Sequence, residues 1–199
     1  IKGAPRHAAL PAGEEDAVMK ACRAVLAVND MNETLRHVTH PVLPPPGLAV
    51  TMIEGYEKDN VVPGNVRLLL DFRIHPGMDH EQVGRFLDKG FEQAGIDGCQ
   101  RTLRYYMPGG EIRQDDRFVK LCLEERERLL GIKSFPQPFE ASCEQCFLTE
   151  QGIRTVICGP GDIAQAHTVG EFTREKQVRD AVKLYGRIID RILYKTKYN

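Results

Sequence analysis

A histidine and a glutamate four residues apart, His167 and Glu171, are the residues whose types and spacing first suggest chemistry. They follow an apolar segment, residues 153–158, and a Gly-Pro-Gly break at residues 159–161. Open α/β sheets place ligand sites in loops at the carboxyl ends of their strands, and imidazole is a common metal ligand and acid–base group. Position alone still favours a structural role for a single loop histidine. It also favours Glu171 as a cap of the next helix.

Three more polar residues lie where a side chain could meet a ligand. His7 is in a loop bounded by glycine and proline, Asn60 is in a loop between two expected strands, and Arg73 is on a polar strand face. Each has a structural alternative. Asn60 can hold a turn through its side chain, and Arg73 can pair with Asp71, two residues back on the same face. Taken singly, none of the three indicates a function.

Composition indicates a globular chain and excludes several classes of protein. The 199 residues carry a net charge of −1, with 42% hydrophobic and 28% charged residues. A near-neutral chain lacks the basic face of a nucleic-acid binder. No apolar run approaches the roughly 18 residues needed to cross a bilayer. We therefore expect neither a nucleic-acid nor a membrane partner.

Six cysteines are spread unevenly along the chain, which favours free thiols over a disulfide framework. Cys143 and Cys146 form a lone C-x-x-C without a second pair, and this is a weak signal for a zinc half-site or a redox pair. The simplest setting for such a chain is a reducing cytoplasm. A redox protein that uses these two thiols stays open as a weaker interpretation.

Hydrophobic periodicity predicts an α+β unit in the first half of the chain. A helix with small apolar residues at helical spacing covers residues 17–28, and a proline-rich loop follows it. Residues 48–56 and 65–74 alternate as strands, residues 79–94 form an amphipathic helix, and residues 99–107 form a further strand. The chain begins as if inside a strand, and with this first strand the elements predict a two-layer β-α-β-β-α-β unit.

A Pro-Gly-Gly sequence at residues 108–110 interrupts this pattern, and we take it as the boundary between residues 1–108 and residues 109–199. Beyond it the pattern predicts helices at residues 115–130 and 143–151, a buried strand at residues 153–158 and a last helix at residues 174–194. These elements are typical of the tail of an α/β domain. Because one strand does not make a sheet, we expect the second half to be incomplete.

Three segments of the chain, in this order, resemble the motifs of one enzyme family. They read IKGAPRHAALPAG, DNVVPGNVRLLLDFRIHPGM and GPGDIAQAHTVGEFT. Together they resemble the dinuclear-zinc hydrolase family of aminoacylase, acetylornithine deacetylase, succinyl-diaminopimelate desuccinylase and glutamate carboxypeptidase. The resemblance covers nearly the whole chain, and its last motif is most similar to the acetylornithine deacetylases.

The resemblance implies a small α+β lid domain inserted into a catalytic α/β domain. Residues 1–108 match the lid, and residues 109–199 match the C-terminal part of the catalytic domain. The expected fold class is therefore α/β with α+β, a two-layer β-α-β-β-α-β lid followed by part of an α/β zinc-peptidase domain. Because such lids often mediate dimerisation, the implied assembly is a homodimer formed through the lid.

The resemblance also implies roles for individual residues. His167 is the terminal metal ligand, and Glu171 supports its loop. His7 stabilises the oxyanion, often in the partner subunit's active site, while Arg73 receives the substrate carboxylate and Asn60 contacts the substrate beside it. These roles suit the residue types, because a guanidinium binds carboxylates in bidentate fashion and an imidazole can donate to an oxyanion.

The family's other metal ligands are a His-x-Asp, a bridging aspartate and an acidic pair, all upstream of the lid, and this sequence contains none of them. We expect the segment that carries them to be missing from the chain. Glu144 aligns loosely with an acidic position of the family and is expected only to support the site. A single histidine cannot hold two metal ions.

The implied function is a zinc-dependent hydrolase that cleaves an N-acyl or peptide amide bond of an amino-acid derivative or short peptide. Its two zinc ions, with cobalt or manganese as substitutes, supply a bound hydroxide that attacks the amide carbonyl. An upstream glutamate takes the proton, and His7 helps to hold the oxyanion. This chain alone is expected to be inactive. The alternative is a non-catalytic binding or dimerisation module that descends from such an enzyme and has a degenerate metal site.

Overall fold

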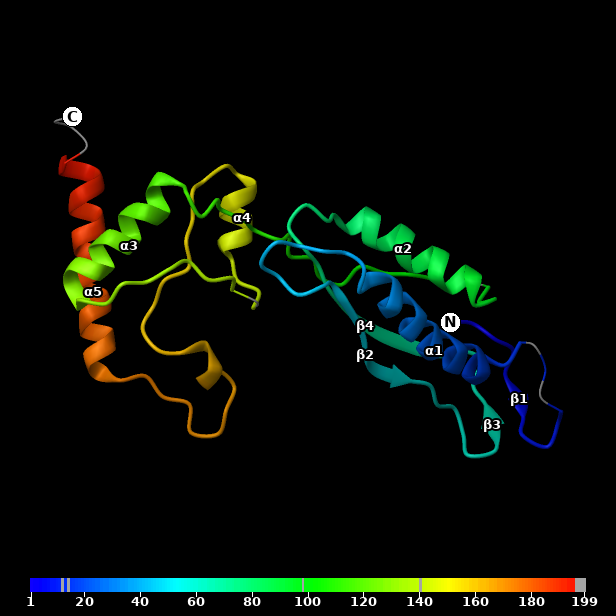
Figure 1. Cartoon of the computed structure of the whole chain (residues 1–199). Helices are drawn as coiled ribbons and strands as arrows, with labels where there is room; N and C mark the ends of the chain where they lie inside the picture. Colours follow the sequence, from blue (N-terminus) through cyan, green and yellow to red (C-terminus); the bar gives the residue numbers. More distant parts are fainter. Residues whose placement is uncertain (12, 14, 98, 140, 196–199) are drawn as a thin grey trace. The chain divides into compact units, whose positions relative to one another are not determined.

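The computed structural model describes residues 1–11, 13, 15–97, 99–139 and 141–195 (Figure 1). The chain divides into two compact units, unit 1 (Ile1–Gly109) and unit 2 (Gly110–Asn199). None of the helices in the described ranges combines the length and the apolar character that a membrane span requires.

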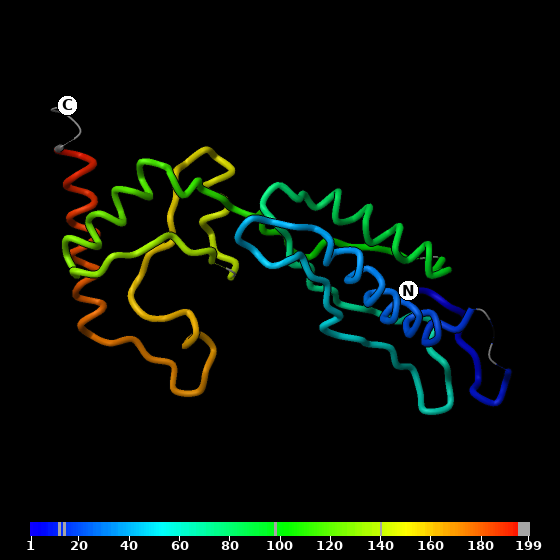
Figure 2. The backbone as a smooth tube through the Cα atoms, viewed as in Figure 1, coloured from blue at the N-terminus to red at the C-terminus, as the bar shows by residue number. Residues whose placement is uncertain are grey.

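Within its described residues, unit 1 has two helices and two small antiparallel sheets (Figure 1). The elements are β1 (Arg6–His7), α1 (Ala17–Leu35), β2 (Gly47–Glu54), β3 (Val61–Val62), β4 (Arg67–Arg73) and α2 (His80–Gln93). β2 pairs with β4, from Gly47 opposite Arg73 at one end to Glu54 opposite Arg67 at the other. β1 pairs with β3 in a separate ribbon. Figure 2 follows the chain from α1 through the proline-rich loop into β2.

The core of unit 1 lies between its helices and one face of the β2–β4 sheet. Nine buried apolar residues form this core: Ala24, Ala27, Val28, Met31, Leu35, Leu48, Leu87, Phe91 and Ile96. Leu68, Leu70 and Phe72 of β4 pack against it, which confirms the alternation predicted for this strand. Because burying one large apolar side chain contributes about 1.5–3 kcal/mol, this cluster is the main source of stability in unit 1.

Both helices of unit 1 begin at a capping aspartate, which explains where they start. The Asp16 carboxylate accepts the amide of Met19 at 3.0 Å. The Asp79 carboxylate accepts the amide of Gln82 at 2.7 Å, and the Gln82 side chain accepts the amide of Asp79 at 3.2 Å. These bonds satisfy amides that have no partner inside the helix. The Met19 amide, together with the nearby Arg6 guanidinium, outweighs burial and holds the pKa of Asp16 below its ordinary value.

The strand predicted at residues 99–107 does not form, because this segment pairs with no other described strand. Its side chains attach it to α2 instead. The Arg101 guanidinium donates to both carboxylate oxygens of Asp88, at 3.1 and 3.0 Å. It lies directly over Gly84, where an added Cβ would come within 2.5 Å of it. Side-chain contacts thus take the place of the expected backbone ladder.

Unit 2 is helical within its described residues. It contains α3 (Arg117–Leu130), α4 (Gln145–Glu150), the 3₁₀ turn η1 (Ile163–Gln165), α5 (Glu175–Asp190) and the π turn η2 (Arg191–Lys195). The strand predicted at residues 153–158 is not formed. A strand needs a neighbour for its backbone hydrogen bonds, and the described part of unit 2 supplies none. The backbone of Cys158 instead accepts a hydrogen bond from the Tyr185 hydroxyl of α5 at 2.7 Å.

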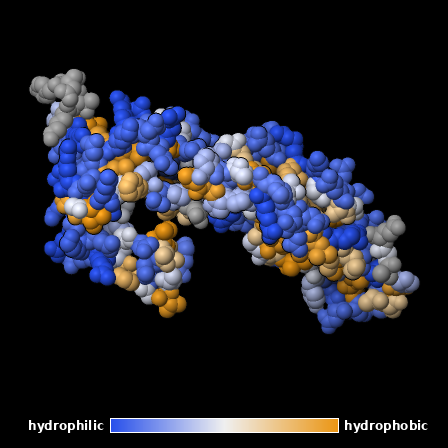
Figure 3. Space-filling view, viewed as in Figure 1, coloured by the Kyte–Doolittle hydropathy of each residue, from blue (hydrophilic) through white to orange (hydrophobic). Residues whose placement is uncertain are grey.

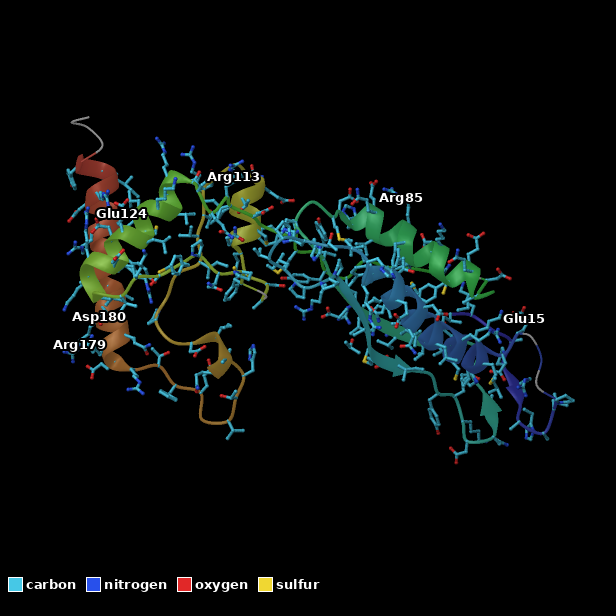
Figure 4. The ribbon with its side chains drawn as sticks, in the orientation of Figure 1. Glu15, Arg85, Arg113, Glu124, Arg179 and Asp180 are labelled. Atoms are coloured by element: carbon cyan, nitrogen blue, oxygen red, sulfur yellow. The ribbon has the colours of Figure 1, made fainter. Side chains whose placement is uncertain are left out.

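A buried carboxylate joins α3 to the C-terminal helix. Glu125 is 4% exposed and accepts hydrogen bonds from Arg128 at 3.0 Å, Arg187 at 2.9 Å and Arg191 at 2.9 Å. Its neighbour Glu124, labelled on α3 in Figure 4, contacts Arg191 at 2.6 Å. Burial acts to raise the pKa of Glu125, but the hydrogen bonds from Arg187 and Arg191 prevail and hold it below its ordinary value. The two helices are therefore linked by charge.

The apolar face predicted for the last helix is present but exposed. Its exposed members lie three or four residues apart: Val178, Val182, Tyr185, Ile189 and Ile192. On α5, Leu184 is the buried residue. The pattern of the helix was therefore predicted correctly, but the described chain leaves that face uncovered.

Candidate functional site

The β1–β3 ribbon brings His7 and Asn60 together. His7 lies opposite Val61 in the antiparallel pair, and the amide of Ala8 donates to the backbone oxygen of Asn60 at 2.8 Å. The two side chains meet with His7 Nε2 and the Asn60 amide 3.0 Å apart. Both residues are exposed, so the pair is presented to solvent and to any approaching ligand.

An open surface depression of about 270 Å³ lies beside this pair, between the ribbon and the first turn of α1. Its lining residues are Ala8, Asp16, Val18, Met19, Asp59, Val61, Val62 and Pro63. The two carboxylates of the lining are already engaged, because Asp16 pairs with Arg6 and Asp59 accepts the Tyr56 hydroxyl at 3.1 Å. The remaining wall is largely apolar.

Arg73 lies at the other end of the β2–β4 sheet. It is opposite Gly47, whereas residues 55–66, which include Asn60, follow the end at which Glu54 meets Arg67. β4 has 7 residues, so its ends are about 20 Å apart at the usual strand rise of roughly 3.3 Å per residue. The Arg73 guanidinium contacts Asp71 at 2.8 Å, which is the structural alternative that the sequence allowed.

His167 has an unusual backbone. Its φ of 62° places a non-glycine residue in the left-handed region, which is uncommon and is concentrated at functional sites. Its amide donates to the Glu171 carboxylate at 3.0 Å, and the amide of Glu171 donates to Thr168 at 3.2 Å. Glu171 therefore closes the histidine loop and does not cap α5, whose N-cap is Arg174.

Glu144 and the C-x-x-C pair lie at the start of α4. Glu144 is exposed and makes no capping hydrogen bond with its side chain. Cys146 is buried, and its Sγ donates to the backbone oxygen of Cys143 at 3.1 Å. Burial raises the pKa of the Cys146 thiol. A raised pKa disfavours the thiolate, which is the reactive form, so this geometry gives the redox interpretation no support.

The described residues do not form a complete metal centre. Among them, no group of three or more histidine, cysteine, aspartate or glutamate side chains is placed to hold a metal ion. A two-metal site needs several bridging and terminal ligands, and His167 offers one exposed imidazole.

Comparison with known proteins relates the chain to a family of peptidases and deacetylases. Residues 1–98 match the M20 peptidase dimerisation domain. An acetylornithine deacetylase from Myxococcus xanthus is 27% identical over 181 residues, which cover 86% of this chain and 46% of that protein. An N-acetyl-L-citrulline deacetylase from Xanthomonas campestris is 27% identical over 163 residues, which cover 81% and 43%. The domain match and these relatives together support an M20 family metallopeptidase fragment.

A solved peptidase structure supports the fold. A tripeptidase from Staphylococcus aureus superposes with a TM-score of 0.69 at 21% identity, over 94% of this chain and 48% of that one. The mixed α/β architecture expected from the sequence is thus confirmed as that of the M20 dimerisation domain and its attached segment. This chain spans about half the length of the curated relatives that it matches.

The sequence motifs pointed to His7 and Asn60 but not to Ala9, whose backbone amide contacts the His7 ring. The amide of Ala9 donates to His7 Nδ1 at 3.1 Å, within a turn closed by a hydrogen bond from the Leu10 amide to the backbone oxygen of His7 at 3.0 Å. An alanine carries no functional side chain, so the only available signal was its position two residues after the histidine.

Proposed function

We propose that this chain is part of a metal-dependent hydrolase that cleaves the N-acyl or peptide amide bond of an amino-acid derivative or short peptide. The observation that carries the proposal is the exposed His7–Asn60 pair, 3.0 Å apart, within a unit that matches the M20 dimerisation domain. The deacetylase relatives support amide hydrolysis as the reaction. The proposal includes that this chain alone is inactive, since its one candidate metal ligand, His167, cannot hold two metal ions.

In this proposal each polar residue has one task. His7 and Asn60 donate hydrogen bonds to the carbonyl oxygen as negative charge develops on it, which is a large contribution to such reactions. Arg73 binds the substrate carboxylate through its planar guanidinium, after exchanging its contact with Asp71. The substrate is therefore an amino-acid derivative with a free carboxylate.

The proposed cofactor is a pair of zinc ions, for which cobalt or manganese can substitute, in the complete protein. When bound, such ions supply a Lewis acid and an activated water. His167 contributes one ligand, Glu171 holds its loop in the left-handed backbone, and Glu144 supports the same region. The proposed location is the cytoplasm, where the six free thiols of the chain would stay reduced.

The complete protein and its His167→Ala variant test this proposal. We expect the wild type to contain zinc and to hydrolyse N-acetyl amino acids, and the variant to lose metal and keep less than about 1% of the activity. The matched control is His37→Ala, which changes an exposed histidine after α1 and should leave both properties intact. A complete protein without bound metal, or a fully active His167→Ala variant, would instead favour the non-catalytic module.

We also propose that the partner of unit 1 is a second copy of this chain. The family match to a dimerisation domain supports this, and so does the position of the candidate residues. His7 and Asn60 lie at one end of the sheet and Arg73 lies about 20 Å away at the other. One N-acyl amino acid is too short to touch both ends, so the two groups serve different active sites.

Mixing two inactive variants tests this arrangement directly. A dimer of one His7→Ala chain and one Arg73→Ala chain keeps a single intact site if His7 acts on the partner's substrate. Random mixing should then restore about a quarter of the wild-type activity, because about half of the dimers are mixed and each has one working site. The same mixture should stay inactive if both residues serve one site in the same chain.

An exposed apolar stripe on α1 is the proposed contact between copies. Val18, Cys22 and Leu26 follow each other at four-residue spacing, and Leu26 is 65% exposed although it is apolar. Figure 3 shows hydrophobic surface over the part of unit 1 where α1 and β2 lie. Leu26→Glu should therefore convert the dimer to a monomer in analytical ultracentrifugation. The control is Leu103→Glu, at a position that is 55% exposed outside the helices.

A further inference from the structure

The imidazole of His7 is engaged at both ring nitrogens. Nδ1 lies 3.1 Å from the backbone amide of Ala9, and Nε2 lies 3.0 Å from the side-chain amide of Asn60. These two contacts come from different parts of the ribbon, the turn after β1 and the loop before β3. Together they determine which nitrogen carries the proton.

The contact with Ala9 has only one chemical form. A backbone N–H donates and never accepts, so Nδ1 must present its lone pair to Ala9. A neutral imidazole with a bare Nδ1 carries its hydrogen on Nε2. Asn60 Nδ2 is the atom placed against Nε2, but two N–H groups would then oppose each other, so we assign the facing position to the acceptor oxygen Oδ1. The Asn60 oxygen and nitrogen exchange places by a rotation that leaves the shape of the side chain unchanged.

We propose that the Ala9 amide and Asn60 fix His7 as the Nε2–H tautomer and order a chain of hydrogen bonds from Ala9 to His7 to Asn60. In this order the Asn60 oxygen accepts from the ring, and its NH₂ group turns away from it. The outward NH₂ group of Asn60 is then the free N–H donor of the pair, and the Nε2–H can donate to an approaching group only by leaving the Asn60 oxygen. It suits an oxygen acceptor such as a carbonyl, carboxylate or oxyanion, and it disfavours ammonium ions.

The opposite order is less favourable because the backbone cannot adjust. It would place a hydrogen on Nδ1 against the N–H of Ala9, which loses one hydrogen bond of about 1 kcal/mol and sets two donors face to face. The Ala9 peptide cannot rotate away, because the Leu10–His7 bond and the Ala8–Asn60 bond hold the chain on both sides of it. The Asn60 side chain, by contrast, turns freely about its last bond.

Two other histidines follow the same rule and serve as internal references. His40 Nδ1 accepts the amides of Val42 at 3.3 Å and Leu43 at 3.2 Å, so its hydrogen is also on Nε2. His75 Nε2 lies 2.6 Å from the backbone oxygen of Pro44, which can only accept. All three rings should therefore show the same tautomer.

Long-range ¹H–¹⁵N correlation spectra of the labelled 199-residue chain test this inference without any assay of activity. At mildly alkaline pH, the wild-type spectrum should show a bare Nδ1 and a protonated Nε2 for His7, with the pattern of His40 and His75. Asn60→Ala should keep this tautomer, because the Ala9 amide remains in place. A His7 ring protonated on Nδ1 in the wild type, or a switch of tautomer in Asn60→Ala, would overturn the proposal.

The consequence for catalysis rests on the proposed function and has a separate test in the complete protein. Asn60→Asp keeps the acceptor for Nε2–H but removes the outward NH₂ donor. We expect kcat to fall by about 100-fold, as for the loss of one oxyanion donor, while His7 keeps its tautomer in the spectrum. An unchanged kcat with the expected tautomer would refute the catalytic use of the pair and leave its proton order standing.

Discussion

Unit 1 and unit 2 are stabilised by different interactions. In unit 1, two helices and a sheet face bury a cluster of nine apolar residues. In unit 2, the buried apolar residues among those described are Val119, Cys146 and Leu184, and α3 is joined to α5 and η2 by Glu125 and its arginines. The comparison shows that amphipathic helices can be held in place mainly by apolar burial in one unit and mainly by ion pairs in the other.

The largest effect should come from removing a core side chain of unit 1. Phe91 is 8% exposed within the core cluster, so Phe91→Ala leaves a cavity and should lower the free energy of unfolding of unit 1 by about 3–5 kcal/mol. Amide hydrogen exchange of α1 and β4 measures this loss. Tyr105→Ala, at a ring that is 72% exposed, is the control and should cost much less. Equal losses would show that unit 1 does not depend on its cluster.

A smaller but distinct effect is expected from the charged link in unit 2. Glu125→Gln removes the negative charge that Arg128, Arg187 and Arg191 surround, and it should lower the stability of unit 2 by about 2 kcal/mol. The matched control is Glu124→Gln, whose partly exposed carboxylate pairs only with Arg191 among the described residues and should cost about 0–1 kcal/mol. Exchange of the α3 amides reports both. Similar values for the two variants would contradict the special role of Glu125.

The same carboxylate makes unit 2 sensitive to acid. The pKa of Glu125 in the folded chain lies below its ordinary value, so its contribution is fully present above the ordinary range of a glutamate. That contribution is lost as the pH falls through the lowered folded value. Wild-type unit 2 should therefore lose more stability on acidification than the Glu125→Gln variant does. Parallel pH profiles of the two chains would rule this out.

The smallest effect is expected on the exposed face of α5. Val182 is 66% exposed, and Val182→Ser should change the stability of this chain by no more than about 0.5 kcal/mol. Val28→Ser, at a valine that is 5% exposed in unit 1, should cost several times more. A large loss for Val182→Ser would mean that this face is covered in solution, and the contrast between the units would then disappear.

The helices could be predicted from the sequence, and two strands could not. The apolar spacing of α1 and α2 is a local feature, and the structure confirms both helices. Residues 99–107 and 153–158 have the composition of strands, but strand formation also requires a partner backbone. Without a partner strand, these segments are attached to helices by side-chain hydrogen bonds. Arg101 binds Asp88 of α2, and Tyr185 of α5 binds the backbone oxygen of Cys158.

The candidate site shows a similar division. The motifs pointed to His7, Asn60 and Arg73 as a group, and the structure brings the first two together and places the third at the far end of the sheet. The contribution of Ala9 was invisible, because it comes from a backbone amide. The roles of His167, Glu144 and Glu171 stay predictions, although the Glu171 carboxylate does hold the amide of His167.

By itself, the sequence determined the types of the helices, the apolar faces and the family motifs, because these depend on residues within one or two turns of each other. Tertiary structure decided which apolar faces are covered, which strand segments find a partner and which side chain meets Nε2 of His7. Each of these depends on groups far apart in the chain. His7 and Asn60 are 53 positions apart in the sequence, and their contact exists only because β1 pairs with β3.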